Sequence, residues 1–320
     1  MKRGYEHDMR RARARIAAVP SESLDTRFGP VEYAVQGVGP PLLLAHGVLG
    51  CHADGVEGWW SKLTRPGFRV ISPSRFGYFG SALPRDASPA DQADAYTLLL
   101  DHLGVDQAVV MGFSAGSASV LELAIRHPAR VVALILASAR LGGGVTANKV
   151  LAPVFRVAYG ADRSFWAFKV LMPMAYARMM GLPRGYRPTP DEREALQGIR
   201  NLLFPFRPRR DGAVFDGFVG NPVADRFPFE QLTVPTLVIS AKDDPLAPYA
   251  FATVAAQRIP GARLVTIERG GHLFLGNDHE VRKEIHAFVE SVQRPDAHAT
   301  SGEGLSARTA RDQSPYACDG

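Results

Sequence analysis

The sequence predicts an α/β fold built on a mostly parallel sheet. Short apolar runs such as 42–45 and 131–137 are typical of strands buried on both faces of such a sheet. They alternate with helical patterns such as 89–103, where apolar residues recur at helical spacing between an N-capping serine and a closing glycine. This alternation favours right-handed crossovers between neighbouring parallel strands.

The elements follow in order along the chain. A strand is expected at 31–36, because the run alternates and ends in a glycine-proline turn. The other strands are expected at 42–45, 68–71, 108–111, 131–137, 236–240 and 264–267, and helices at 89–103, 250–258 and 278–292. Between 142 and 228 the alternation stops, and the chain becomes rich in Phe, Arg, Pro and Met, with helical pieces expected at 165–180 and 191–204.

Composition places the chain among ordinary globular proteins, with 320 residues, 46% hydrophobic and 22% charged. A core of this size needs neither disulfides nor metal. The two cysteines, Cys51 and Cys318, lie in contexts that do not suggest a bridge, and so few cysteines fit a cytoplasmic location. The Cys and His residues lack metal-ligand spacing, so we expect no metal and no cofactor.

The net charge of +5 gathers partly in the first twenty residues. We expect residues 1–20 to form a disordered basic arm, with contact to nucleic acid or acidic lipid as the alternative; no nucleic-acid partner is expected. No membrane span is expected, because charged residues interrupt the most apolar later stretch, 150–180. The polar residues 294–320 are expected to form a disordered tail.

A candidate nucleophile lies in Gly112-Phe113-Ser114-Ala115-Gly116, which fits the pattern G-x-S-x-G. A buried strand runs into this segment and an amphipathic helix leaves it, as in a strand-to-helix turn that exposes a serine. Such a turn strains the serine backbone, and the residues two positions away must be small. The alternative is a glycine-rich turn with an incidental serine.

The loop 46–50 follows the strand at 42–45 and contains two glycines that allow close approach to a substrate. Acyl transfer builds negative charge on the carbonyl oxygen, and fixed backbone N–H groups stabilise that charge. We expect the two donors to be the N–H groups of Val48 and Ala115, and a structural role for His46.

A serine nucleophile needs a base, and the base needs a carboxylate partner. Asp243 and Asp244 follow the strand at 236–240, so either can reach the edge of the sheet where Ser114 is expected. His272 follows the strand at 264–267 after two glycines. The alternative for the acidic pair is a turn that caps the next helix.

In these motifs, from about Asp25 to Gln293, the chain resembles the α/β-hydrolase superfamily. The resemblance selects Asp244, which has Pro248 four residues on, and implies a triad of Ser114, Asp244 and His272. It also implies an eight-stranded, mostly parallel sheet with helices on both faces. The implied core covers 21–141 and 229–293, and a helical cap over 142–228 follows the sixth strand.

Two residues depart from the patterns of relatives. Many relatives carry Asp where this chain has Ser74, which we expect to leave that turn less charged. C–C bond hydrolases often have Trp after the catalytic histidine, whereas Leu273 stands here, and this weakens that assignment.

The sequence thus predicts a serine hydrolase, carboxylesterase-like, that cleaves an ester or similar acyl bond of a small, partly apolar substrate through an acyl-enzyme. The alternatives are a C–C bond hydrolase with the same triad and a non-catalytic ligand-binding protein of this fold. A homodimer is left open.

Overall fold

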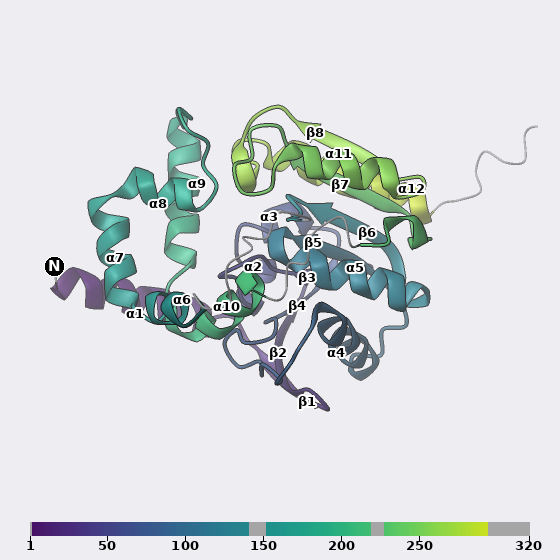
Figure 1. Cartoon of the computed structure of the whole chain (residues 1–320), viewed down its shortest axis with the longest axis horizontal. Coiled ribbons are helices and arrows are strands. Elements are labelled where there is room, and N and C mark those ends of the chain that lie inside the picture. The colour runs from purple at the N-terminus through teal and green to yellow at the C-terminus, as the bar shows by residue number, and fades with distance from the viewer. Residues whose placement is uncertain (1, 141–151, 219–226, 294–320) are drawn as a thin grey trace, which may run out of the picture.

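The computed structural model describes residues 2–140, 152–218 and 227–293 (Figure 1), and within them the strands form one eight-stranded sheet. The strands are β1 (Glu22–Thr26), β2 (Gly29–Gln36), β3 (Pro41–Ala45), β4 (Arg69–Pro73), β5 (Ala108–Phe113), β6 (Val131–Ala137), β7 (Thr236–Ala241) and β8 (Arg263–Ile267).

The strand order is β1-β2-β4-β3-β5-β6-β7-β8. The strands from β4 to β8 in this order pair in parallel, and β1 and β2 add an antiparallel edge. The predicted eight-stranded, mostly parallel sheet is therefore confirmed. Because β3, β5, β7 and β8 run in parallel, the loops that follow them all leave the sheet at one edge, where ligands bind in folds of this kind.

Helices cover both faces of the sheet. One face packs against α4 (Pro89–His102), α5 (Ser117–Arg126) and α11 (Tyr249–Arg258), and the other against α2 (His52–Val56), α3 (Ser61–Thr64) and α12 (Asp278–Gln293). Successive strand residues point to opposite faces, so that Leu42 joins one core and Leu43 the other. Both leucines are fully buried, which explains why the run at 42–45 is continuously apolar.

Between β6 and β7 the chain forms helices α6–α10, which we call the inserted helices. They are α6 (Ala152–Tyr159), α7 (Asp162–Leu171), α8 (Pro173–Met179), α9 (Pro190–Leu202) and α10 (Arg210–Phe218). The single helical piece expected at 165–180 is two helices, because Pro173 cannot continue α7 and instead begins α8. Parts of the expected cap, 142–151 and 219–226, lie outside the described residues, as does the expected tail 294–320.

The expectation of a disordered arm at 1–20 is wrong for most of that segment, which forms helix α1 (Lys2–Ala17). Met9 and Ala12 are buried, and the rings of Tyr5 and Trp166 meet edge to face at 5.8 Å. Helix α1 lies along the inserted helices (Figure 1). Few apolar residues hold it there, which is why the arginine-rich sequence gave no clear amphipathic signal.

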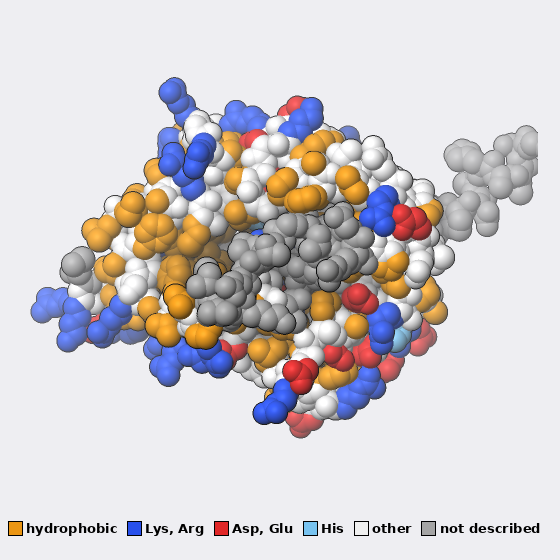
Figure 2. Space-filling view, viewed as in Figure 1, with side chains coloured by type: hydrophobic (Ala, Val, Ile, Leu, Met, Phe, Trp, Pro, Cys, Tyr) orange, Lys and Arg blue, Asp and Glu red, His pale blue; other side chains and the backbone are white. Residues whose placement is uncertain are grey.

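The inserted helices expose several large apolar side chains. Val157 and Leu171 are 76% and 67% exposed, and Figure 2 shows hydrophobic side chains gathered over this side of the molecule, with Lys and Arg side chains near α1. Among the described residues, no helix has the length and apolar character needed to cross a membrane.

Candidate active site

Ser114 lies on a sharp turn between β5 and α5. Its backbone has φ +50°, a left-handed conformation that is strained for any residue with a side chain. A Cβ on Gly112 would lie 2.7 Å from Ser117 Cα, and one on Gly116 would lie 2.2 Å from the carbonyl oxygen of Ala45. Gly112 therefore lets β5 and α5 approach each other, and Gly116 lets the turn lie against the end of β3, so both positions require a residue without a side chain, as the sequence pattern indicated.

His272 lies on a short 3-10 turn (Gly271–Leu273) after β8 and faces the loop after β7. Its Nδ1 is 2.8 Å from Asp244 Oδ2, and both side chains are buried. The other oxygen of Asp244, Oδ1, accepts hydrogen bonds from the N–H groups of Leu246 and Ala247. The carboxylate is thus fixed by its own loop while it faces the imidazole.

Asp243 faces a different set of donors. Its two carboxylate oxygens accept hydrogen bonds from the N–H groups of Gly270 (3.1 Å) and Gly271 (2.9 Å). Gly270 has φ +140° and Gly271 has φ +62°, so this loop needs glycine at both positions. Asp243 therefore holds the loop that carries His272 and does not contact the imidazole itself.

Ser114 and His272 line one cavity of about 250 Å³. Its walls come from the loop 47–50, the two tryptophans Trp59 and Trp60, and the inserted helices through residues such as Met180 and Ile199. Ser114 Oγ makes no hydrogen bond within the described residues. The cavity brings the hydroxyl and the imidazole to one space.

The expected oxyanion donors lie beside this cavity. Val48 lines it directly, and Ala115 is buried immediately after Ser114 at the start of the turn into α5. Leu49 has φ +66°, so the loop is held in a conformation that a free chain would rarely adopt.

His46 fixes the start of this loop. Its Nε2 accepts a hydrogen bond from the N–H of Arg75 at 3.0 Å, so its Nδ1 carries the proton and donates to the carbonyl of Gly47 at 2.7 Å. Burial lowers the pKa of His46 well below its ordinary value, and the nearby Arg75 charge adds to this. The imidazole is therefore neutral and joins the loop after β3 to the loop after β4.

A buried polar cluster that the sequence did not predict supports the same loop. Tyr78 Oη donates to Asp216 Oδ2 at 2.5 Å and accepts from the N–H of Leu49 at 3.4 Å. Arg75 forms a two-pronged ion pair with Asp216, with Nη1 2.8 Å from Oδ1. Asp216 belongs to α10, so an inserted helix holds the loop that carries Val48. No local motif could identify it, because 138 residues separate it from Tyr78.

Gly181 was also missed by the sequence, although it touches His272. Its carbonyl accepts a hydrogen bond from the N–H of His272 at 3.1 Å, and a Cβ on Gly181 would lie 2.2 Å from His272 Cβ. Ser138, directly after β6, donates to the carbonyl of His272 at 2.9 Å. The histidine backbone is thus held from two sides.

Ser74 itself brings no charge to its turn, but a carboxylate from another strand lies beside it. Glu32 of β2 places its carboxylate there and accepts hydrogen bonds from Ser74 Oγ (3.0 Å) and the N–H of Gly80 (3.1 Å). Burial alone would raise the pKa of Glu32, but hydrogen bonds and charge from His52 and these donors hold it below its ordinary value. The carboxylate at this turn thus comes from β2.

Across residues 2–140, 152–218 and 227–293, no cluster of three His, Cys, Asp or Glu side chains has the arrangement of a metal site.

Asp54 and Arg140 add polar groups to the Ser114 cavity. Burial raises the pKa of Asp54, whose Oδ2 accepts a hydrogen bond from the N–H of Cys51.

A parallel sheet of this order, with a serine on a strand-to-helix turn beside a His–Asp pair, defines a protein class: the alpha/beta hydrolases. The family model described as alpha/beta hydrolase fold matches residues 40–278. The chain belongs to this family.

The chain is also similar to proteins named as hydrolases. The chain is 27% identical over 283 residues to the uncharacterized hydrolase YcgS of Bacillus subtilis, and the alignment covers 84% of this chain and 98% of that protein. It is 31% identical over 242 residues to 2-hydroxymuconate semialdehyde hydrolase of Pseudomonas putida, covering 74% and 82%. An alpha/beta hydrolase fold protein from Nakamurella multipartita superposes with a TM-score of 0.66 at 26% identity, covering 85% and 99%.

Proposed function

We propose that the protein is a serine hydrolase that cleaves an ester or a similar acyl bond of a small, partly apolar substrate. The observation that carries the proposal is the pairing of Asp244 with His272 at the rim of a cavity that also holds Ser114. A histidine oriented by a buried carboxylate, next to a strained serine, is the arrangement that activates a hydroxyl for acyl transfer.

The reaction runs in two halves. His272 takes the proton of Ser114 as the oxygen attacks the carbonyl carbon, and the N–H groups of Val48 and Ala115 bind the oxyanion. The C–O bond to the leaving group breaks, and His272 passes the proton to the departing oxygen. Water then attacks the acyl-enzyme, giving its proton to His272, and Ser114 regains a proton as the acid leaves. Asp244 stabilises the imidazolium in both halves.

Size and polarity of the cavity support the substrate class. A space of about 250 Å³ walled by tryptophan, methionine and isoleucine suits a short acyl group. In this proposal the inserted helices act as a cap, within the domain limits 142–228, because they supply Met180 and Ile199 to the cavity wall. The cytoplasmic location stays a prediction, and a homodimer stays open.

A panel of p-nitrophenyl esters of increasing chain length tests the proposal. We expect cleavage of the acetate and butyrate, much slower cleavage of the palmitate, and loss of all activity in Ser114→Ala. If no ester is cleaved by the folded wild-type protein, ester hydrolysis is wrong.

A C–C bond hydrolase is the second candidate. The similarity to 2-hydroxymuconate semialdehyde hydrolase favours it, and the same triad could serve it. A vinylogous diketone in the same panel separates the two: cleavage of the diketone without ester cleavage would support the second candidate. A protein that cleaves neither, and whose Ser114 is unreactive, would be a binding protein.

A further inference from the structure

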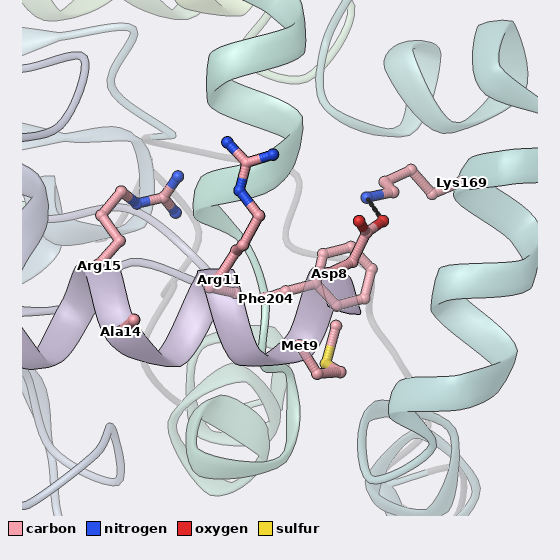
Figure 3. A pocket seen from close by; sticks show the side chains of 8 residues that line it. Asp8, Met9, Arg11, Ala14, Arg15, Lys169 and Phe204 are labelled. Carbon is pink, nitrogen blue, oxygen red and sulfur yellow. Dashed lines mark hydrogen bonds and ion pairs between the residues drawn. The ribbon is translucent and has the colours of Figure 1, made fainter. Parts of the chain in front are cut away.

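A second cavity, of about 430 Å³, lies between α1 and the inserted helices. One wall is α1, and the other is formed by Lys169 of α7 and Phe204, just after α9 (Figure 3). We call it the α1 cavity. It shares no lining residue with the cavity of Ser114.

Positive charge dominates its lining. Arg11 and Arg15 are one helical turn apart and extend from the same side of α1, and Lys169 reaches toward α1 from across the cavity (Figure 3). Asp8 is the one acidic residue among the described side chains that line it. Three cations and one carboxylate thus line the cavity, although Asp54 and Glu57 also lie near enough to Arg15 to act on its charge.

Asp8 is already engaged. Its Oδ2 accepts hydrogen bonds from Trp166 Nε1 at 2.9 Å and from Lys169 Nζ at 3.2 Å. Burial alone would raise the pKa of Asp8, but these two partners hold it below its ordinary value. No hydrogen bond or ion pair joins Arg11 to another described residue. The positive charge of the lining therefore remains largely uncompensated near Arg11.

The rest of the lining is apolar. Met9, Ala12 and Phe204 are buried, and the ring of Phe204 carries Lys169 Nζ 5.0 Å above its centre. A ligand that suits this cavity needs one anionic end and one apolar portion. A carboxylate suits these arginines, because its two oxygens can accept two parallel hydrogen bonds from one planar guanidinium group.

We propose that the α1 cavity binds a monocarboxylate with a short alkyl chain, the carboxylate against Arg11 and Arg15 and the chain against Met9 and Phe204. The volume is in the range of small-molecule sites and accommodates a chain of several carbons. The proposal is independent of the ester chemistry, because it requires no turnover.

Calorimetric titration of the Ser114→Ala protein with sodium octanoate, at fixed ionic strength, tests it. We expect one saturable site for octanoate and far weaker binding of octanol, which lacks the charge. The double variant Arg11→Gln/Arg15→Gln should weaken octanoate binding about fivefold or more, as expected for lost charge-assisted contacts.

A matched double variant is available on the same helix. Arg10→Gln/Arg13→Gln also removes two positive charges from α1, but neither residue lines the cavity, and octanoate affinity should be unchanged. The single variant Arg11→Gln, at an exposed position, should give a smaller loss and is not expected to disturb folding. Circular dichroism and thermal unfolding establish that each variant is folded.

Three results would overturn the proposal. If octanoate shows no saturable binding, or binds no better than octanol, the α1 cavity has no site for a carboxylate. Equal weakening by the two double variants would mean diffuse attraction to a basic helix. Binding that is insensitive to Arg11 and Arg15 would place octanoate elsewhere, for instance in the cavity of Ser114.

Discussion

Tyr78 and Asp216 share a hydrogen bond of 2.5 Å although one follows β4 and the other belongs to α10. The hydroxyl of Tyr78 also accepts a hydrogen bond from the N–H of Leu49 at 3.4 Å, and Leu49 directly follows Val48. Burial raises the pKa of Tyr78 well above its ordinary value, so the phenol stays protonated and continues to donate. One side chain thus joins an inserted helix to the loop proposed to bind the oxyanion.

Tyr78→Phe should therefore lower kcat by about three- to tenfold with little change in KM. The substitution loosens the loop whose N–H stabilises the transition state, but it leaves the cavity that binds the substrate unchanged. The free energy of unfolding should fall by about 1–2 kcal/mol, since Asp216 loses a buried donor. Tyr96→Phe is the control: its hydroxyl meets Ser119 in the interior, 3.2 Å away. Equal kcat losses in both variants would mean that Tyr78 acts only through stability.

Asp244 and Asp243 should differ sharply when each is replaced by asparagine. Asp244→Asn should lower kcat on the order of 10⁴-fold, because an amide cannot hold the histidine tautomer or stabilise the imidazolium. Asp243→Asn should have a much smaller effect, since this residue binds only the N–H groups of Gly270 and Gly271. Steady-state kinetics on a cleaved ester measure both. A larger loss in Asp243→Asn would reverse the assignment.

Gly181→Ala should misplace His272. The new methyl would meet His272 Cβ, and Gly181 has φ +94°, so the clash adds to backbone strain. A shift of about 1 Å in the base is expected to cost about 10²-fold in kcat. Gly185→Ala carries similar strain at φ +76° but meets no atom within 4 Å, so its activity should be nearly unchanged. A fully active Gly181→Ala would show that the contact is unimportant.

His46 should make stability depend on pH below neutrality. Its pKa is lowered on folding, so the unfolded chain takes up a proton first as the pH falls. The stabilisation is complete above the unfolded pKa of about 6.5 and is lost below it, by up to about 1.4 kcal/mol per pH unit. Urea unfolding between pH 5 and 8 should show this slope, reduced in His46→Gln. An unchanged slope would mean that His46 is not the group responsible.

The sequence predicted those parts of the site that follow strands in a repeating order. The sheet, the serine turn and the loops of Asp244 and His272 were recognised because each rests on a local pattern beside a buried strand. The glycines at 112 and 116 were expected on steric grounds, and the close contacts to Ser117 and Ala45 give the reason in atomic terms.

Other features depend on contacts between distant segments. Asp216, Gly181 and Glu32 have no local signature, since their partners lie many residues away and are brought near only by the fold. Helix α1 was missed for a related reason. An arginine-rich segment is typical of a solvated tail, and the contacts of Asp8 with Trp166 and Lys169 join segments far apart in the sequence.

Reaction with a fluorophosphonate, located by peptide mass spectrometry, tests most directly whether the hydroxyl of Ser114 is activated by the His272–Asp244 pair. The account expects one phosphonate on Ser114 in the wild-type protein, none in Ser114→Ala, and strongly slowed labelling in the folded His272→Gln. A wild-type protein that is not labelled, or labelling that persists in Ser114→Ala or proceeds at full rate in His272→Gln, would contradict it.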